Sequence, residues 1–290
     1  MEAIAQVCHL PHADFAESWS AIKLETAVRE RLVAQSLLSL QLRQRFSFEV
    51  MPIHGLIVLS GPPGTGKTTL ARGLANKVAE ALGGNKSQFL QIDPHALASS
   101  SLGKSQKEVT KLFHQIIPER AANGPCIVLL DEVETLAADR RRMSLEANPI
   151  DVHRATDAAL SGIDLLSRQH RNTLLIATTN FPEAVDRALL SRADWIETIG
   201  LPNAMARQDI IADSLDQLAT QWPQVARLKA EMKAFVAASE GMDGRRLRKA
   251  IISAAAASIE TARDLNKLRP EHVIQTLQLA TNRTLREAAE

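Results

Sequence analysis

The sequence predicts an α/β fold over roughly the first 200 of its 290 residues and an all-helical region after them. Short apolar runs alternate with helical periods as far as GLPNAMAR, a pattern typical of a parallel sheet covered by helices. A glycine-rich stretch, GPPGTGKTT, lies between the first of these runs and a helical period. After GLPNAMAR the apolar runs stop, and only helical periodicity remains.

Five apolar runs are expected to form the parallel sheet. They are LIVLS (56–60), QFLQI (88–92), CIVLL (126–130), TLLIATT (173–179) and WIETI (195–199). Between the second and third runs, apolar residues recur at helical spacing and predict a covering helix; they are Val109, Leu112, Phe113, Ile116 and Ile117.

The predicted elements divide the chain into three regions. Residues 1–50 are expected to form a short N-terminal segment with one or two helices within 14–45. Residues 51–201 are expected to form the large α/β subdomain, and residues 202–290 a small helical subdomain. The helices of this last subdomain are predicted at about 204–218, 226–239, 243–262 and 270–287.

Composition excludes several classes of protein. A net charge of +1, an aromatic content of 3% and the lack of tyrosine argue against a nucleic-acid partner, which would need a basic field or stacking platforms. The two cysteines, Cys8 and Cys126, are far apart, and Cys126 begins an apolar run, so a buried thiol is expected in place of a disulfide. The sequence has no signal peptide and no apolar stretch of about 18 residues. We therefore expect a cytoplasmic protein without a membrane partner.

The glycine-rich stretch has the pattern of a phosphate-binding loop, Gly, four residues, then Gly-Lys-Thr. Its glycines let the backbone wrap closely, so that successive amides point at phosphate oxygens. Lys67 is expected to reach the β and γ phosphates of ATP, and Thr68 to hold Mg²⁺. The predicted ATP-binding residues here are Gly61, Pro62, Pro63, Gly64, Thr65, Gly66, Lys67, Thr68 and Thr69. The alternative is a Gly/Pro-rich turn without a ligand.

Two acidic residues follow the apolar run in IVLLDEVETL. Asp131 and Glu132 would lie at the carboxyl end of a strand, the edge where open α/β sheets bind ligands. Asp131 is expected to orient Mg²⁺, partly through water, and Glu132 to polarise the water that attacks the γ-phosphate. The alternative is an acidic helix N-terminus, which the helix dipole favours.

Three further polar residues complete the predicted catalytic set. Asn180, at the end of LLIATTN, can hydrogen-bond both the γ-phosphate and the attacking water; alternatively it is a turn residue. Arg187 and Arg192, in DRALLSRAD, are candidates for an arginine that serves a neighbouring subunit's nucleotide. The alternative for them is surface ion pairing with Asp186 and Asp194.

Basic residues crowd the start of a predicted helix in SEGMDGRRLRKA, where the helix dipole disfavours cations. A polyanion nearby would remove this conflict, so we predict that Arg245 contacts the γ-phosphate. The alternative is a solvated basic face.

The order of these elements resembles that of the AAA+ ATPases, with a Walker A motif at 61–68, a Walker B motif at 127–132, sensor-1 Asn180, an arginine finger, and a helical lid with a sensor-2 arginine. Within them, the chain resembles the pachytene-checkpoint or thyroid-receptor-interacting ATPases over about residues 14–262. The phrases that carry this resemblance are GPPGTGKTTL, LLDEVETLAADR, ATTNFPEAVDRALLSRADWIETIGLP and GMDGRRLRKA.

This resemblance implies a homohexameric ring that hydrolyses ATP and opens closed HORMA-domain proteins by engaging their N-terminus in its pore. About fifty residues precede the P-loop, which is similar to the short bacterial form found in cyclic-oligonucleotide antiphage systems. There the HORMA protein is bound to a nucleotidyltransferase, and separating the two restrains signalling.

The resemblance also implies that HALASSSLGKSQKEV (95–109) contains the first pore loop. Its tip would be Ser101, Leu102 and Gly103, where family members carry an aromatic-hydrophobic pair. A second pore loop is predicted at 139–151, with a polar surface loop as the alternative.

Two other classes of protein share part of this machinery. A metabolite kinase would share Lys67 and Asp131 but would need neither an arginine from a neighbour nor a sensor on a lid. A ring ATPase acting on another protein or on nucleic acid would share all of the ATP-binding residues.

Overall fold

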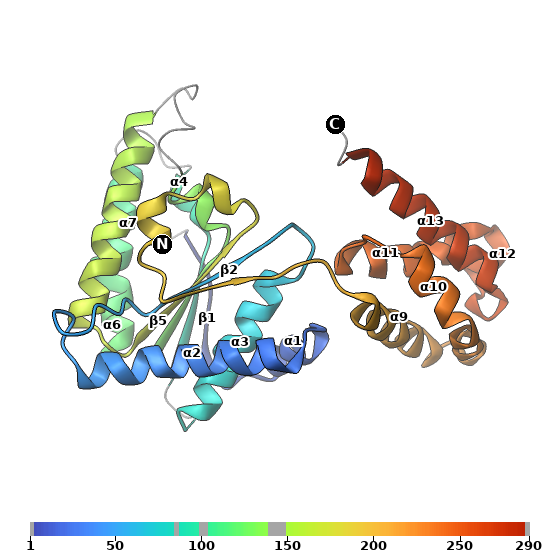
Figure 1. The fold of residues 1–290 in the computed structure, drawn as a ribbon, viewed down its shortest axis with the longest axis horizontal. Coiled ribbons are helices and arrows are strands. Elements are labelled where there is room, and N and C mark those ends of the chain that lie inside the picture. Colours follow the sequence, from blue (N-terminus) through green and yellow to red (C-terminus); the bar gives the residue numbers. More distant parts are fainter. Residues whose placement is uncertain (1–2, 84–86, 99–103, 139–148, 288–290) are drawn as a thin grey trace. The chain divides into compact units, whose positions relative to one another are not determined.

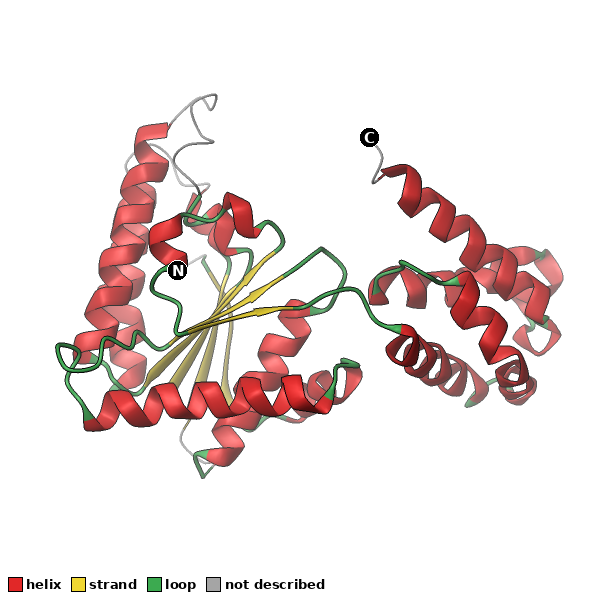
Figure 2. Cartoon of the chain, viewed as in Figure 1, coloured by secondary structure: helices red, strands yellow, loops and turns green. Residues whose placement is uncertain are grey.

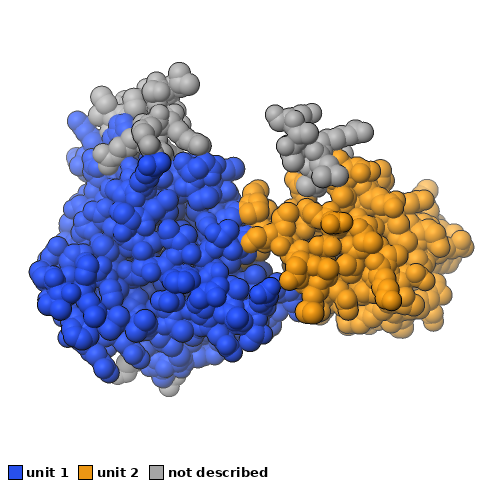
Figure 3. Space-filling model, viewed as in Figure 1, with its two compact units in different colours: residues 1–61, 67–199 blue, residues 62–66, 200–290 orange. Residues whose placement is uncertain are grey.

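A computed structural model of the chain describes residues 3–83, 87–98, 104–138 and 149–287. The chain forms two compact units, shown in blue and orange in Figure 3. The first comprises residues 1–61 and 67–199, and the second comprises residues 62–66 and 200–290. None of the described helices combines the length and the apolar character that crossing a bilayer requires.

The first unit is built on a six-stranded sheet with the order β1-β3-β4-β5-β2-β6. Figure 1 shows this sheet with helices on both sides. The five predicted strands are present: β2 (Leu56–Ser60), β3 (Ser87–Ile92), β4 (Cys126–Leu130), β5 (Thr173–Thr179) and β6 (Trp195–Thr198). They pair in parallel, and β2 to β5 are buried along their whole length. Burial on both faces explains why the sequence shows continuous apolar runs in place of alternation.

One strand was not predicted. β1 (Ile4–Leu10) pairs antiparallel with β3 at the edge of the sheet, and its residues alternate between half-buried and exposed. The helices expected in the N-terminal segment do form, as α1 (Ala13–Ala21) and α2 (Thr26–Arg45). The N-terminal segment is therefore part of the first unit and adds a strand to its sheet.

Helices cover both faces of the sheet. On one face lie α1, α2 and α3 (Lys67–Ala81), whose apolar side chains pack with Ile57, Leu59 and Ile176. On the other lie α5 (Lys104–Lys111), a π-helical turn (Leu112–Ile116), α6 (Ile117–Ala121) and α7 (Pro149–Gln169). Their side chains pack with Val58 and Leu175, which point to the opposite side of the strands. A short helix, α4 (Pro94–Ala98), follows β3.

The second unit is helical (Figure 2). Its helices are α9 (Ala204–Ala219), α10 (Met232–Ala238), α11 (Gly244–Ala254), α12 (Ile259–Arg263) and α13 (Pro270–Glu287). A 3-10 segment (Pro223–Glu231) joins α9 to α10. The single helix predicted at 243–262 is interrupted, because Ser258 starts a new helix by exchanging capping hydrogen bonds with Thr261.

Candidate active site

Three of the predicted motifs meet at one edge of the sheet in the first unit. Lys67 and Thr68 open α3 just beyond β2, Asp131 and Glu132 follow β4, and Asn180 follows β5. The three strands are neighbours and run in parallel, so their carboxyl ends share one edge. The sheet therefore brings together residues that are more than a hundred positions apart in the sequence.

Asp131 is held by two hydroxyl groups. Thr68 Oγ1 donates to Asp131 Oδ1 over 2.8 Å, and Thr178 Oγ1 donates to the same oxygen over 2.6 Å. Thr178 Oγ1 also accepts the backbone N–H of Glu132 over 3.1 Å, which ties the end of β4 to β5. Sequence analysis missed Thr178, although a polar residue near the end of a buried strand is a signal for such a role.

The Thr68 hydroxyl and the Asp131 carboxylate are oxygen ligands of the kind that Mg²⁺ prefers. The described residues contain no group of three or more His, Cys, Asp or Glu side chains that could hold a metal ion. This donor set fits a magnesium ion that takes its remaining ligands from water and phosphate, as in P-loop sites.

Lys67 and the start of the glycine-rich loop fit a phosphate group. The Lys67 side chain is 5% exposed, and its Nζ donates to the carbonyl oxygen of Gly61 over 2.8 Å. Gly61 has φ of +140°, and a Cβ there would lie 2.1 Å from the carbonyl oxygen of Ile199. A side chain at this position would therefore clash with the backbone of Ile199, so the turn that presents the Gly61 carbonyl oxygen to Lys67 requires glycine.

Glu132 has an unusual backbone conformation. Among the described residues it is the single non-glycine residue with positive φ, at φ 53° and ψ 54°. This left-handed region costs a non-glycine residue roughly 1–2 kcal/mol, and such conformations cluster at functional sites. Asn180 Nδ2 donates to Glu132 Oε1 over 3.2 Å, so the two predicted catalytic residues are in contact.

Two residues that sequence analysis missed support this pair. His95, in α4, bonds Glu132 Oε2 through Nε2 over 2.9 Å. Glu134 Oε1 accepts the backbone N–H of Asn180 over 3.1 Å. Glu132 is therefore held from both sides, by a group that follows β3 and a group that follows β5.

The His95 imidazole is sensitive to the charge of its partner. The hydrogen bond that His95 makes with the Glu132 carboxylate raises the pKa of His95 above its ordinary value, although the side chain is exposed. We expect Glu132→Gln to lower this pKa, because the variant removes the negative charge that favours the imidazolium. NMR titration of the imidazole would measure the shift, with the exposed Glu119→Gln as the control. An unchanged His95 pKa in Glu132→Gln would show that the two side chains do not meet in solution.

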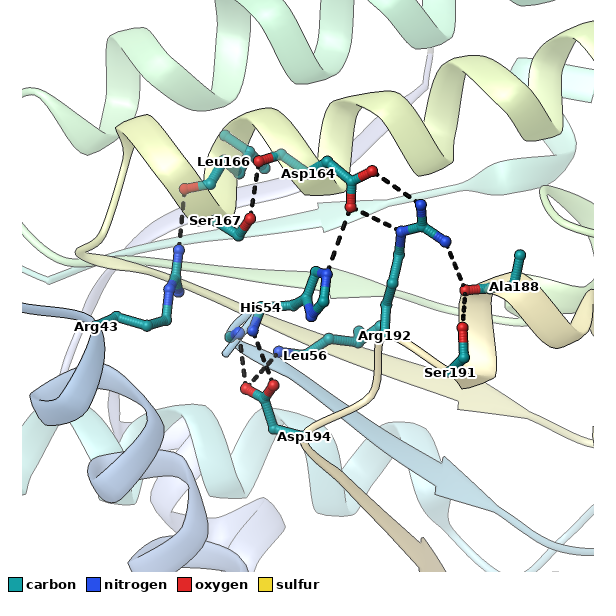
Figure 4. A network of polar contacts seen from close by, with 11 residues as sticks. Arg43, His54, Leu56, Asp164, Leu166, Ser167, Ala188, Ser191, Arg192 and Asp194 are labelled. Atoms are coloured by element: carbon teal, nitrogen blue, oxygen red, sulfur yellow. Dashed lines mark hydrogen bonds and ion pairs between the residues drawn. The ribbon is translucent and has the colours of Figure 1, made fainter. Parts of the chain in front are cut away.

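Arg192 lies at the amino ends of the parallel strands, opposite the carboxyl ends that carry the residues described above. Two residues after it, Asp194 donates its backbone N–H to Leu56 at the start of β2 and accepts the backbone N–H groups of His54 and Gly55 (Figure 4). The five residues of β2 span roughly 16 Å at about 3.3 Å per residue, and Lys67 lies beyond their other end. Arg192 is therefore far from Lys67 and from the other predicted ATP-binding residues of its own unit.

Sequence analysis left surface ion pairing with Asp186 and Asp194 as the alternative to a finger role, and the structure gives Arg192 a different carboxylate partner. Arg192 instead bonds Asp164 in α7, because the Asp194 carboxylate is occupied by backbone N–H groups and Asp186 caps the short helix α8 (Arg187–Leu190). Arg187, the other candidate finger, is exposed at the start of α8.

In the second unit, the middle of the glycine-rich loop contacts the start of α11. Gly64 accepts the backbone N–H of Arg245 through its carbonyl oxygen over 3.3 Å, and a Cβ on Gly64 would lie 2.2 Å from Asp243 Oδ1. Asp243 caps α11 by accepting the Arg246 N–H, and its carboxylate also pairs with the Arg246 side chain. This cap partly offsets the basic charge, so the dipole argument for Arg245 is weaker than the sequence indicated.

The predicted pore-loop residues Ser101, Leu102 and Gly103, and residues 139–148 of the second pore loop, lie outside the described residues.

Comparison with known proteins identifies the family. Residues 57–201 match the family model described as ATPase family associated with various cellular activities (AAA). The chain belongs to the AAA ATPases. This membership confirms the predicted α/β fold and ATPase activity, implies ATP binding, and favours an ATPase over a metabolite kinase.

Relatives of this AAA ATPase place it among the pachytene checkpoint proteins. It is 46% identical over 273 residues to CD-NTase-associated protein 6 of Pseudomonas aeruginosa, covering 93% of the chain and 90% of that protein. It is 30% identical over 305 residues to the human pachytene checkpoint protein 2 homolog, covering 96% and 69%. Against the putative pachytene checkpoint protein 2 of Caenorhabditis elegans it is 33% identical over 220 residues, covering 74% of the chain but only 51% of that protein.

Solved structures of related proteins have the same fold as this chain. A structure of C. elegans PCH-2 superimposes with a TM-score of 0.76 at 26% identity, covering 97% of this chain and 75% of that one. The Escherichia coli MS115-1 HORMA:CdnC:Trip13 complex contains a chain that superimposes with a TM-score of 0.74. The match covers 95% of each chain at 19% identity and shows a shared fold.

Proposed function

We propose that this AAA ATPase hydrolyses ATP to open or disassemble a closed HORMA-domain protein, and that it thereby down-regulates a cyclic-nucleotide antiphage signalling complex. The observation that carries the proposal is the 46% identity, over 93% of the chain, to a protein whose name records association with a CD-NTase. The pachytene checkpoint phrases in the sequence support a HORMA-domain client.

The site supports hydrolysis by a residue set with separate tasks. Lys67 holds the β and γ phosphates, while Glu132 accepts a proton from the water that attacks the γ-phosphorus as the bond to the β,γ-bridging oxygen breaks. Asn180 contacts Glu132 and orients the same water. Mg²⁺ held at Thr68 and Asp131 would neutralise phosphate charge. We also propose that Arg245, near the start of α11, contacts the γ-phosphate.

A ring explains the position of Arg192. An arginine at the amino edge of the sheet is too far from its own P-loop, but in a head-to-tail assembly that closes it can reach the next subunit's nucleotide. We therefore propose a homohexamer in which Arg192 acts in trans. Ser101, Leu102 and Gly103 would contact the client's N-terminus in the pore.

The direct test uses a HORMA-domain protein from the same genome, closed around a fluorescent peptide. We expect the wild-type protein with ATP and Mg²⁺ to release the peptide, since opening the client removes its grip. Fluorescence anisotropy would follow the release, with ADP as the control. Retention of the peptide by a client whose N-terminus is intact, under conditions where ATP is turned over, would contradict a HORMA-domain client.

A further inference from the structure

The Arg192 guanidinium is fixed by its own subunit along two of its edges. Nε donates to Asp164 Oδ1 over 2.7 Å, and Nη2 donates to Asp164 Oδ2 over 2.8 Å (Figure 4). Nη1 donates to the carbonyl oxygen of Ala188 over 2.8 Å. A carboxylate that chelates the Nε and Nη2 edge in this way sets the plane of the group as well as its position.

This arrangement leaves one edge of the guanidinium for another ligand. The group has five N–H donors in one plane. The three bonds use Nε–H, one N–H of Nη2 and one N–H of Nη1, and the Ala188 bond turns back toward the arginine's own helix. The two remaining N–H groups lie on the outer edge and have no partner among the described residues. Two parallel donors of this kind match two oxygens of a phosphoryl group.

The surroundings of Asp164 favour this pairing. The Arg192 side chain is 23% exposed and the Asp164 side chain 36%, so the pair is only partly screened by water. His54 Nε2 also lies 3.4 Å from Asp164 Oδ1. Burial lowers the pKa of His54, which favours the neutral imidazole, so Arg192 is the stronger partner of Asp164. The hydrogen bond from Arg192 lowers the pKa of Asp164.

We propose that Asp164 is a positioning residue for catalysis: it orients Arg192 so that the outer edge of the guanidinium binds the γ-phosphate held by the neighbouring subunit. This inference rests on the proposed function of Arg192 as a finger in trans. Asp164 belongs to α7, a helix of 21 residues, so the carboxylate is fixed by a rigid element. Without it, the arginine keeps its charge but loses its orientation, and a misplacement of about 1 Å can cost about 100-fold in rate.

A double-mutant cycle tests this assignment. We expect Asp164→Asn to lower kcat by roughly 10- to 100-fold without changing ATP affinity, and Arg192→Ala to lower kcat further. If Asp164 acts through Arg192, the double variant has the kcat of Arg192→Ala alone. Asp157→Asn, an exposed carboxylate on the same helix, is the matched control and keeps wild-type kcat. A double variant slower than Arg192→Ala, or an Asp164→Asn variant with wild-type kcat, would overturn the positioning role.

Mixed assemblies separate this inference from the proposed function. Lys67→Ala subunits lack an ATP site but carry an intact Arg192, so they restore ATPase activity to Arg192→Ala subunits if the finger acts in trans. Adding Asp164→Asn to the Lys67→Ala subunits should reduce this restoration by the factor found in the cycle. Adding it to the Arg192→Ala subunits should change nothing. If neither variant restores activity, the finger in trans is contradicted. If Lys67→Ala subunits with and without Asp164→Asn restore the same activity, only the role of Asp164 is contradicted.

Discussion

Lys67→Ala is expected to abolish ATP binding at physiological nucleotide concentrations. The ammonium group is almost fully buried beside the Gly61 carbonyl, at the start of α3. Its removal leaves the phosphates without their cation, and charge-assisted hydrogen bonds of this type contribute about 1.5–3 kcal/mol each. Two such bonds, to the β and γ phosphates, imply a loss of about 100-fold or more in affinity.

Titration with a fluorescent ATP analogue measures this loss. Lys77→Ala is the matched control, because Lys77 lies on the same helix but is only half-buried and pairs with Glu80. Thermal unfolding of both variants verifies that they remain folded. ATP affinity near wild type in a folded Lys67→Ala protein would contradict the assignment of the phosphate-binding loop.

The positions of the strands could be predicted, and the glycine-rich and acidic motifs could be located relative to them, because both depend on local sequence. β4 is buried on both faces, so it reads as an uninterrupted apolar run, and Asp131 and Glu132 follow it covalently. β1 escaped prediction because its outer face is exposed and its seven residues alternate without a turn signal of their own. An edge strand of this kind is defined by its partner β3, about eighty residues later.

The residues that contact the candidate catalytic groups could not be predicted, because their partners are distant in the sequence. His95 and Glu132 are 37 positions apart, and Thr178 and Asp131 are 47 apart. Histidine and threonine are too common in soluble proteins for such pairs to be recognised by type alone. For Arg192, nearness in sequence was misleading: Asp194 is two residues away but binds the backbone entering β2, while Asp164, 28 residues earlier, holds the guanidinium.

Glu132→Gln is expected to bind ATP with nearly wild-type affinity but to hydrolyse it roughly 10²–10⁴-fold more slowly. Glutamine has the same shape and can still accept the Asn180 amide at Oε1, so the contact between these residues survives. The amide cannot accept the proton of the attacking water, so the ATP-bound assembly persists.

Single-turnover hydrolysis and size measurement with ATP test both parts of this expectation, with the exposed Glu183→Gln as the control. Normal turnover by Glu132→Gln would remove Glu132 from the mechanism.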